Sequence, residues 1–165
     1  MSEYVHGPYS YVQVAVFFVI ALSSALFARR LWCVAGGSWR SRVPAILLSF
    51  WAVGIGVAGC FDAEDRVLGT SQGTVHNAAV TVAFVMALLA MALRRDGPAP
   101  TSRLLRANAP VWTLVTGIAL AATAILADRP GFGLAERFLA AVVVAWLITT
   151  GQWLMSAIRD VAPGD

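Results

Sequence analysis

Five long apolar runs dominate this sequence, and short polar connections separate them. A transmembrane helix needs about 20 predominantly apolar residues to cross the hydrocarbon core of a bilayer, and these runs are close to that length. Only 13% of the 165 residues are charged, whereas about a quarter is usual in a soluble domain. The sequence therefore predicts an all-α, polytopic membrane bundle, with residues 1–165 in one domain. The predicted helices span residues 11–28, 43–61, 75–93, 109–127 and 133–158.

The arginines predict how this bundle is oriented. The chain has no lysine, and its twelve arginines alternate in number from one connection to the next. Nine lie in the first and third connections and after the last run, while three lie in the second and fourth connections. The positive-inside rule places the nine in the cytoplasm. We therefore expect a multi-pass protein of the cell membrane, with its N-terminus outside and its C-terminus in the cytoplasm.

Most groups capable of acid–base chemistry fall on the predicted outer side. The connection between the second and third runs, together with the start of the third run, contains Asp62, Glu64, Asp65, His76 and Asn77. Glu136 and Arg137 open the last run on the same side. The sequence leaves two interpretations open. These residues form a functional cluster, or the loop carboxylates are solvated surface charges and Glu136 is a capping carboxylate that the helix dipole stabilises.

His76 stands at the start of a row of small residues. The row comprises Ala79, Ala83, Ala87 and Ala90, and a second small-residue row, in the second run, comprises Ala52, Gly56 and Cys60. Residues at this spacing share one helix face, and small residues let helices approach closely in lipid. We therefore expect His76 to face the bundle interior, where ionisable residues usually have partners and roles. The alternative is a histidine that acts only as a cap or an interfacial side chain.

If the second, third and fifth runs converge at their outer ends, Asp62, His76 and Glu136 form a candidate catalytic set. Carboxylates and histidine are common general acids and bases, and Arg137 is suited to hold a carboxylate or phosphate through two hydrogen bonds. The other candidate binding residues are Asn77, Glu64, Asp65, Trp51, Trp112 and Trp146. A polar rim above an apolar, aromatic interior suits a hydrophobic small molecule with a polar head.

The sequence predicts no cofactor and no metal site. It lacks His-Glu-x-x-His, Cys-x-x-Cys and a glycine-rich phosphate loop, and it lacks a lysine to form a Schiff base. Its arginine clusters between apolar runs are typical of topology signals and do not indicate a nucleic-acid partner. Cys33 and Cys60 lie at opposite predicted membrane faces, roughly 30 Å apart, whereas a disulfide needs Cα atoms within roughly 7 Å. We expect free thiols.

Three short motifs resemble a known family. They are Gly-Cys-Phe-Asp at residues 59–62, Gly-Thr-Val-His-Asn at 73–77, and Gly-Leu-Ala-Glu-Arg at 133–137 with Trp146 further along. Over residues 43–155 the chain resembles the bacterial "domain of unknown function 998" membrane-protein family. The resemblance implies that Asp62, His76 and Arg137 are positions of interest, and it implies no reaction. That family usually has six helices, so the resemblance also implies that its first helix is missing here.

Three functions are compatible with these features. The first is a membrane-embedded acid–base enzyme, of the cyclase or isomerase type, that acts on a lipid or isoprenoid-like substrate at the outer membrane face. The second is a non-catalytic membrane module, such as an assembly subunit, a lipid-binding partner or a small carrier. The third, a channel or transporter protomer, requires oligomerisation because five short helices with an alanine-rich interior leave little lumen. Membrane lipids are the expected partners in every case, and a homo- or hetero-oligomer remains open.

Overall fold

The protein is described here by a computed structural model that covers residues 10–35, 39–61, 71–93, 102–126 and 132–161. Within these ranges all regular structure is helical. The helices are α2 (Ser10–Val34), α3 (Trp39–Cys60), α4 (Ser71–Leu93), α5 (Ser102–Ile125) and α6 (Phe132–Val161). Each contains a segment long and apolar enough to cross a membrane. The predicted all-α bundle of five membrane-spanning helices is therefore confirmed, while the orientation of its termini stays a prediction.

Several helix boundaries differ from those predicted. The first helix was expected to end at Ala28, before two arginines, but α2 continues to Val34. Likewise α3 begins at Trp39 rather than at residue 43, and α5 begins at Ser102 rather than at residue 109. Arginine is a good helix former, so a charged residue marks the edge of the apolar segment without ending the helix.

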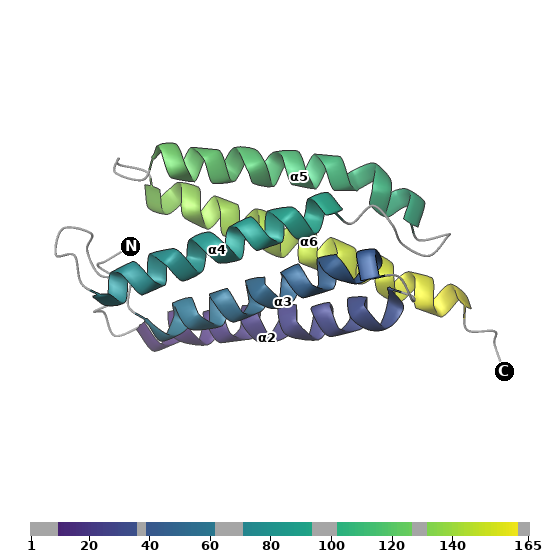
Figure 1. The fold of residues 1–165 in the computed structure, drawn as a ribbon, viewed down its shortest axis with the longest axis horizontal. Helices are drawn as coiled ribbons and strands as arrows, with labels where there is room; N and C mark the ends of the chain where they lie inside the picture. The colour runs from purple at the N-terminus through teal and green to yellow at the C-terminus, as the bar shows by residue number, and fades with distance from the viewer. Residues whose placement is uncertain (1–9, 36–38, 62–70, 94–101, 127–131, 162–165) are drawn as a thin grey trace.

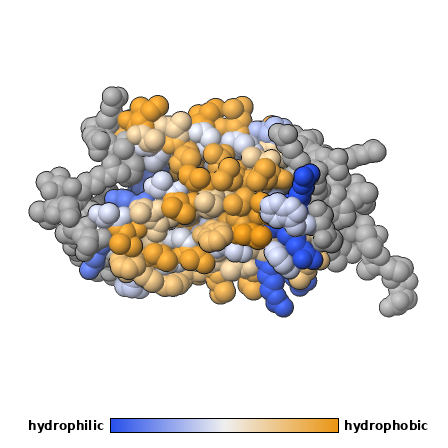
Figure 2. All heavy atoms as spheres, in the orientation of Figure 1, coloured by the Kyte–Doolittle hydropathy of each residue, from blue (hydrophilic) through white to orange (hydrophobic). Residues whose placement is uncertain are grey.

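The helices run antiparallel to their neighbours in sequence, as Figure 1 shows. Helix α3 packs between α2 and α4, and α5 packs against α4 and α6, whereas α2 and α6 contact each other only sparsely. We call the end at which α2, α4 and α6 begin the His76 end. Hydrophobic residues form a broad band between the two ends of the bundle, and hydrophilic residues lie toward the ends (Figure 2). This pattern is typical of a multi-pass membrane protein.

Small residues hold α2, α3 and α4 close together. A Cβ atom at Gly54 of α3 would lie 2.9 Å from the Cβ of Ala83 in α4. A Cβ atom at Gly56 would lie 3.7 Å from the Cβ of Ala21 in α2. Ala87, further along the predicted alanine row, is fully buried. The predicted close packing of the small-residue rows is thus observed, except that Cys60 is exposed. Cys33 and Cys60 are free thiols, as predicted.

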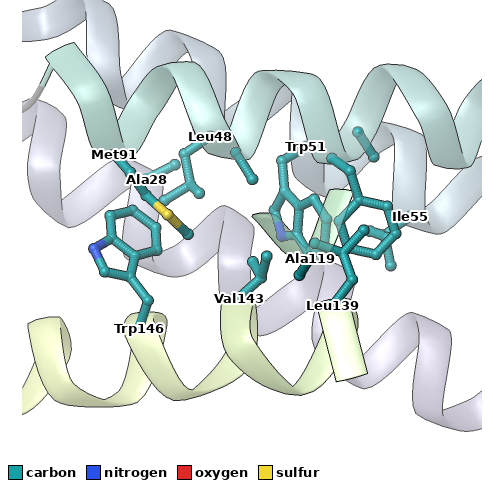
Figure 3. Close-up of a cluster of buried hydrophobic side chains, with 12 residues drawn as sticks. Ala28, Leu48, Trp51, Ile55, Met91, Ala119, Leu139, Val143 and Trp146 are labelled. Carbon is teal, nitrogen blue, oxygen red and sulfur yellow. The ribbon is translucent and has the colours of Figure 1, made fainter. Parts of the chain in front are cut away.

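Helix α6 completes the core through large side chains (Figure 3). The buried cluster between α6 and the other helices includes Leu48, Trp51, Phe84, Met91, Leu139, Val143 and Trp146. Two side-chain hydrogen bonds cross this cluster. The Trp51 Nε1–H donates to the Ser24 Oγ at 3.0 Å, joining α3 to α2. The Thr116 hydroxyl donates to the Met91 sulfur at 3.2 Å, joining α5 to α4. The bundle therefore combines a tight three-helix layer with a wider interface to α6.

Candidate functional site

His76 caps the end of helix α3. Its side chain is 4% exposed, and its Nδ1 lies 2.9 Å from the Ala58 carbonyl oxygen and 3.0 Å from the Phe61 carbonyl oxygen. Because both neighbours are acceptors, Nδ1 must carry the hydrogen and donate it. The last carbonyls of a helix have no partner within that helix. His76 supplies one, and it thereby fixes the start of α4 against the end of α3.

Phe17 connects this histidine to helix α2. The two rings meet edge to face with centroids 6.1 Å apart. A Cβ atom at Gly59 would lie 2.8 Å from the Phe17 Cβ, so this phenylalanine sits tightly over the last turn of α3. His76 faces the interior, as expected from the alanine row, and it is held there by three helices.

We expect replacement of His76 by alanine to lower the free energy of unfolding by about 1–3 kcal/mol. The reason is that two carbonyl oxygens would lose their donor in a region with little water. Chemical or thermal unfolding in detergent measures this loss. Asn77→Ala, on the adjacent residue, is the control and should stay within about 0.5 kcal/mol of the wild type. A His76→Ala protein as stable as the Asn77→Ala protein would contradict the capping role.

A groove lies between α2 and α6, where those two helices touch only sparsely. Its volume is about 400 Å³. Its lining is almost entirely apolar, and it comprises Val12, Gln13, Val16, Phe17, Ile20, Trp51, Ile55, Val80, Phe84, Glu136, Arg137, Ala140 and Val144. We call this space the α2–α6 groove. Phe17, which contacts His76, is part of its wall.

The polar groups of the α2–α6 groove are concentrated at the His76 end. Gln13 lies in the first turn of α2, and Glu136 and Arg137 lie in the first two turns of α6. Glu136 is half-buried and Arg137 is exposed, and both interact with other groups of the protein. From Glu136 to Val144 the groove extends about 12 Å along α6, which is eight steps of 1.5 Å. The floor there is aromatic, because Trp51 and Phe84 pack edge to face at 5.1 Å.

The sequence matches the family described as "Protein of unknown function (DUF998)" over residues 1–153. The chain belongs to the DUF998 family. The match begins at residue 1, whereas the resemblance was expected to cover residues 43–155, so helix α2 lies within the family region as well. Comparison with curated proteins and with solved structures gave no match.

The structure brings together some of the predicted site residues of this DUF998 protein. Glu136, Arg137 and Trp51 all line the α2–α6 groove. His76 and Asn77 do not line it, although the His76 ring contacts Phe17 in the groove wall. The three loop carboxylates Asp62, Glu64 and Asp65 lie outside the described residues.

The two other predicted tryptophans pack in the core of the DUF998 bundle. Trp146 is 4% exposed and meets Phe27 edge to face at 6.4 Å. Trp112 is partly buried against the same core cluster. Neither lines the α2–α6 groove. In the described part of the chain, these two side chains join helices to one another.

Sequence reasoning missed Gln13, Phe17 and Phe84 as groove residues of the DUF998 protein. Gln13 carried a usable signal, because a polar side chain inside an apolar run usually faces a partner or a cavity. Phe17 and Phe84 carried none, since aromatic residues in apolar runs are equally compatible with lipid contact or core packing. Their role depends on which helices are neighbours.

Proposed function

We propose that this protein binds an amphiphilic molecule, a lipid or an isoprenoid-like compound, in the α2–α6 groove. The observation that carries the proposal is the distribution of polarity in the groove. Glu136, Arg137 and Gln13 lie at the His76 end, and apolar side chains line the remainder. A ligand with one polar end and one hydrocarbon end matches this arrangement, because each part would meet groups of its own polarity.

The polar head would bind at the start of α6. An arginine side chain presents several N–H donors in a fixed plane, and it can hold a carboxylate or a phosphate with two parallel hydrogen bonds. Arg137 lines the groove and is exposed, which supports this role. Gln13 offers both a donor and an acceptor to the same head. The proposed ligand is therefore one with an acidic head.

The hydrocarbon part would lie over the aromatic floor. Trp51 and Phe84 are almost completely buried, so they provide a fixed surface rather than a mobile one. Ala140 in α6 is small and half-buried, and it leaves room between the two helices. A larger residue at this position would occupy the space that the ligand needs.

Acid–base catalysis on the bound molecule is the second candidate function, and Glu136 favours it. Glu136 lines the groove and is half-buried, where its carboxyl group could protonate one carbon of a double bond in the ligand. Its carboxylate could then accept a proton from the carbon on the other side of the resulting cation, which moves the double bond by one position. Such an isomerisation consumes no net proton and needs no cofactor. Asp62 and His76 belong to this proposal as supporting groups, although the His76 Nδ1 already donates to α3. Without the catalytic step, the protein is a lipid-binding module.

Binding of cis-parinaric acid tests the proposal, because this fluorescent fatty acid has a carboxylate head and an apolar tail. We expect Arg137→Gln to raise its Kd about tenfold, the loss expected for a charge-assisted hydrogen-bonded pair. Ala140→Leu should weaken binding by filling the groove. Ala141→Leu is the matched control, since Ala141 is exposed and does not line the groove.

Wild-type affinity in both Arg137→Gln and Ala140→Leu would overturn the binding proposal. Glu136→Gln separates the two functions. Mass spectrometry of the co-purifying lipid gives the double-bond positions. If Glu136→Gln still binds the probe but its lipid lacks the double-bond change seen with the wild type, the wild-type protein is an enzyme. Identical lipid in both proteins indicates a binding module.

A further inference from the structure

A second groove lies at the opposite end of the bundle, between α2 and α3. Its volume is about 410 Å³. The lining residues are Ala25, Ala28, Arg29, Trp32, Ala45, Ile46, Ser49, Phe50 and Val53. We call it the α2–α3 groove. Ser49 already donates to the Ala45 carbonyl oxygen at 2.9 Å, and the charged group that lines this groove is the guanidinium of Arg29.

Positive charge is concentrated around the mouth of this groove. Arg29 lines it, and the guanidinium of Arg42 lies over the Trp32 ring, 4.8 Å from the ring centroid. The Nε of Arg42 is buried and has no hydrogen-bond acceptor among the described residues. Arg30 and Arg40 are exposed nearby in sequence. Asp160 belongs to the last turn of α6, which finishes at this same end of the bundle, and its side chain lies outside the described part of the structure.

We infer that the α2–α3 groove binds an anionic phospholipid. Arg29 and Arg42 hold its phosphate, and one acyl chain lies along the groove. Charge complementarity determines the occupant, because two arginines at one mouth favour an anion. Trp32, which is 43% exposed, lines the groove at its charged end, one helical turn beyond Arg29. Tryptophan prefers this position at the boundary between lipid headgroups and hydrocarbon.

The dimensions of the groove fit one acyl chain. From Ala45 to Val53 it extends about 12 Å along α3 at 1.5 Å per residue, whereas one leaflet of the hydrocarbon core is about 15 Å deep. Ala25 and Ala28 on the α2 side are small, and Phe50 forms part of the opposite side. The chain would therefore lie parallel to the helices, with its head at the arginines and its end near the middle of the bilayer.

This site is distinct from the α2–α6 groove. The two grooves share no lining residue. The charged mouth of the α2–α3 groove is at the end where α2 finishes and α3 begins, while the polar end of the α2–α6 groove is at the His76 end. Loss of lipid binding at one groove is therefore not expected to abolish binding at the other.

Native mass spectrometry of the purified full-length protein tests the inference, with dioleoyl phosphatidylglycerol and dioleoyl phosphatidylcholine as probes. We expect tighter binding of phosphatidylglycerol. Arg29→Gln and Arg42→Gln should each raise its Kd about fivefold, which is the loss expected for one basic residue close to an anionic headgroup. Arg30→Gln is the matched control, because it removes the same charge from the same helix end outside the groove, and it should change the Kd less than twofold.

Ala25→Leu provides a test that leaves the charge unchanged. It fills the α2–α3 groove and should also weaken binding of phosphatidylglycerol, whereas Ala15→Leu, on an exposed position of α2 outside both grooves, should not. Equal affinities for the two lipids in the wild type would overturn the inference. So would phosphatidylglycerol affinities of Arg29→Gln, Arg42→Gln and Ala25→Leu that match those of their controls. Displacement of the lipid by millimolar inorganic phosphate would overturn the role of the acyl chain.

Discussion

Replacement of Trp51 by alanine will lower the free energy of unfolding by about 3–5 kcal/mol, the range for truncating a large aromatic side chain in a core. Trp51 is 1% exposed, and it packs edge to face against Phe84. Its Nε1–H also donates to Ser24, which is itself buried. Alanine would therefore leave a cavity between α3, α4 and α6 and a buried hydroxyl without its donor. Thermal unfolding of the purified protein in detergent measures the loss.

Two variants separate the packing and hydrogen-bond contributions of Trp51. Trp51→Phe keeps an aromatic ring and loses the donor, and we expect it to cost about 1 kcal/mol. A double-mutant cycle with Ser24→Ala should be non-additive, because both changes remove the same bond. Trp39→Ala is the positional control, since Trp39 is 71% exposed in the same helix. A Trp51→Ala loss no larger than that of Trp39→Ala would show that Trp51 does not hold the core together.

Substitution of Gly54 by valine will destabilise the bundle by up to about 3 kcal/mol, the upper end of the usual cost of overpacking. A Cβ atom at this position would lie 2.9 Å from the Ala83 Cβ and 3.0 Å from the Ala79 carbonyl oxygen. The oxygen belongs to the backbone of α4, so it cannot turn aside as a flexible side chain would. Helices α3 and α4 would have to separate, and in lipid their association depends on close van der Waals packing.

Gly117→Val is the matched control for Gly54→Val. Both glycines lie inside membrane-spanning helices, but a Cβ at Gly117 would meet no atom within 4 Å. The control should therefore be neutral or slightly stabilising, because glycine is a poor helix former. Unfolding midpoints of the two variants in the same detergent give the comparison. Equal midpoints would show that the close approach of α3 and α4 contributes nothing to stability.

The fold could be predicted from the sequence because lipid restricts the possible structures. Apolar runs of this length must become helices that satisfy their own backbone hydrogen bonds. The helix face with His76, Ala83 and Ala87 could also be predicted, since it follows from periodicity alone. The exact helix ends could not, because Arg29 and Arg30 are compatible with both a helix and a connection.

The grooves and the role of His76 could not be predicted in the same way. A periodic pattern shows that His76 faces inward, but it does not show that the carbonyl oxygens of Ala58 and Phe61 are its neighbours. Likewise, Glu136 and Arg137 were identified as candidates from their charge. Gln13, from the first helix, lines the same groove, and this depends on the sparse contact between α2 and α6. Such juxtapositions arise from tertiary packing.

The sparse contact between α2 and α6 has a consequence for selectivity. Val12 and Val16, on the α2 side of the groove, are 45% and 50% exposed, so the groove is open toward the surrounding lipid. An enclosed cavity can discriminate between ligands by chain length, because an overlong chain meets a closed end. Here a longer chain could simply continue past Ile20 and Val144 into the bilayer. A protein built in this way would discriminate between molecules by their heads and accept tails of many lengths.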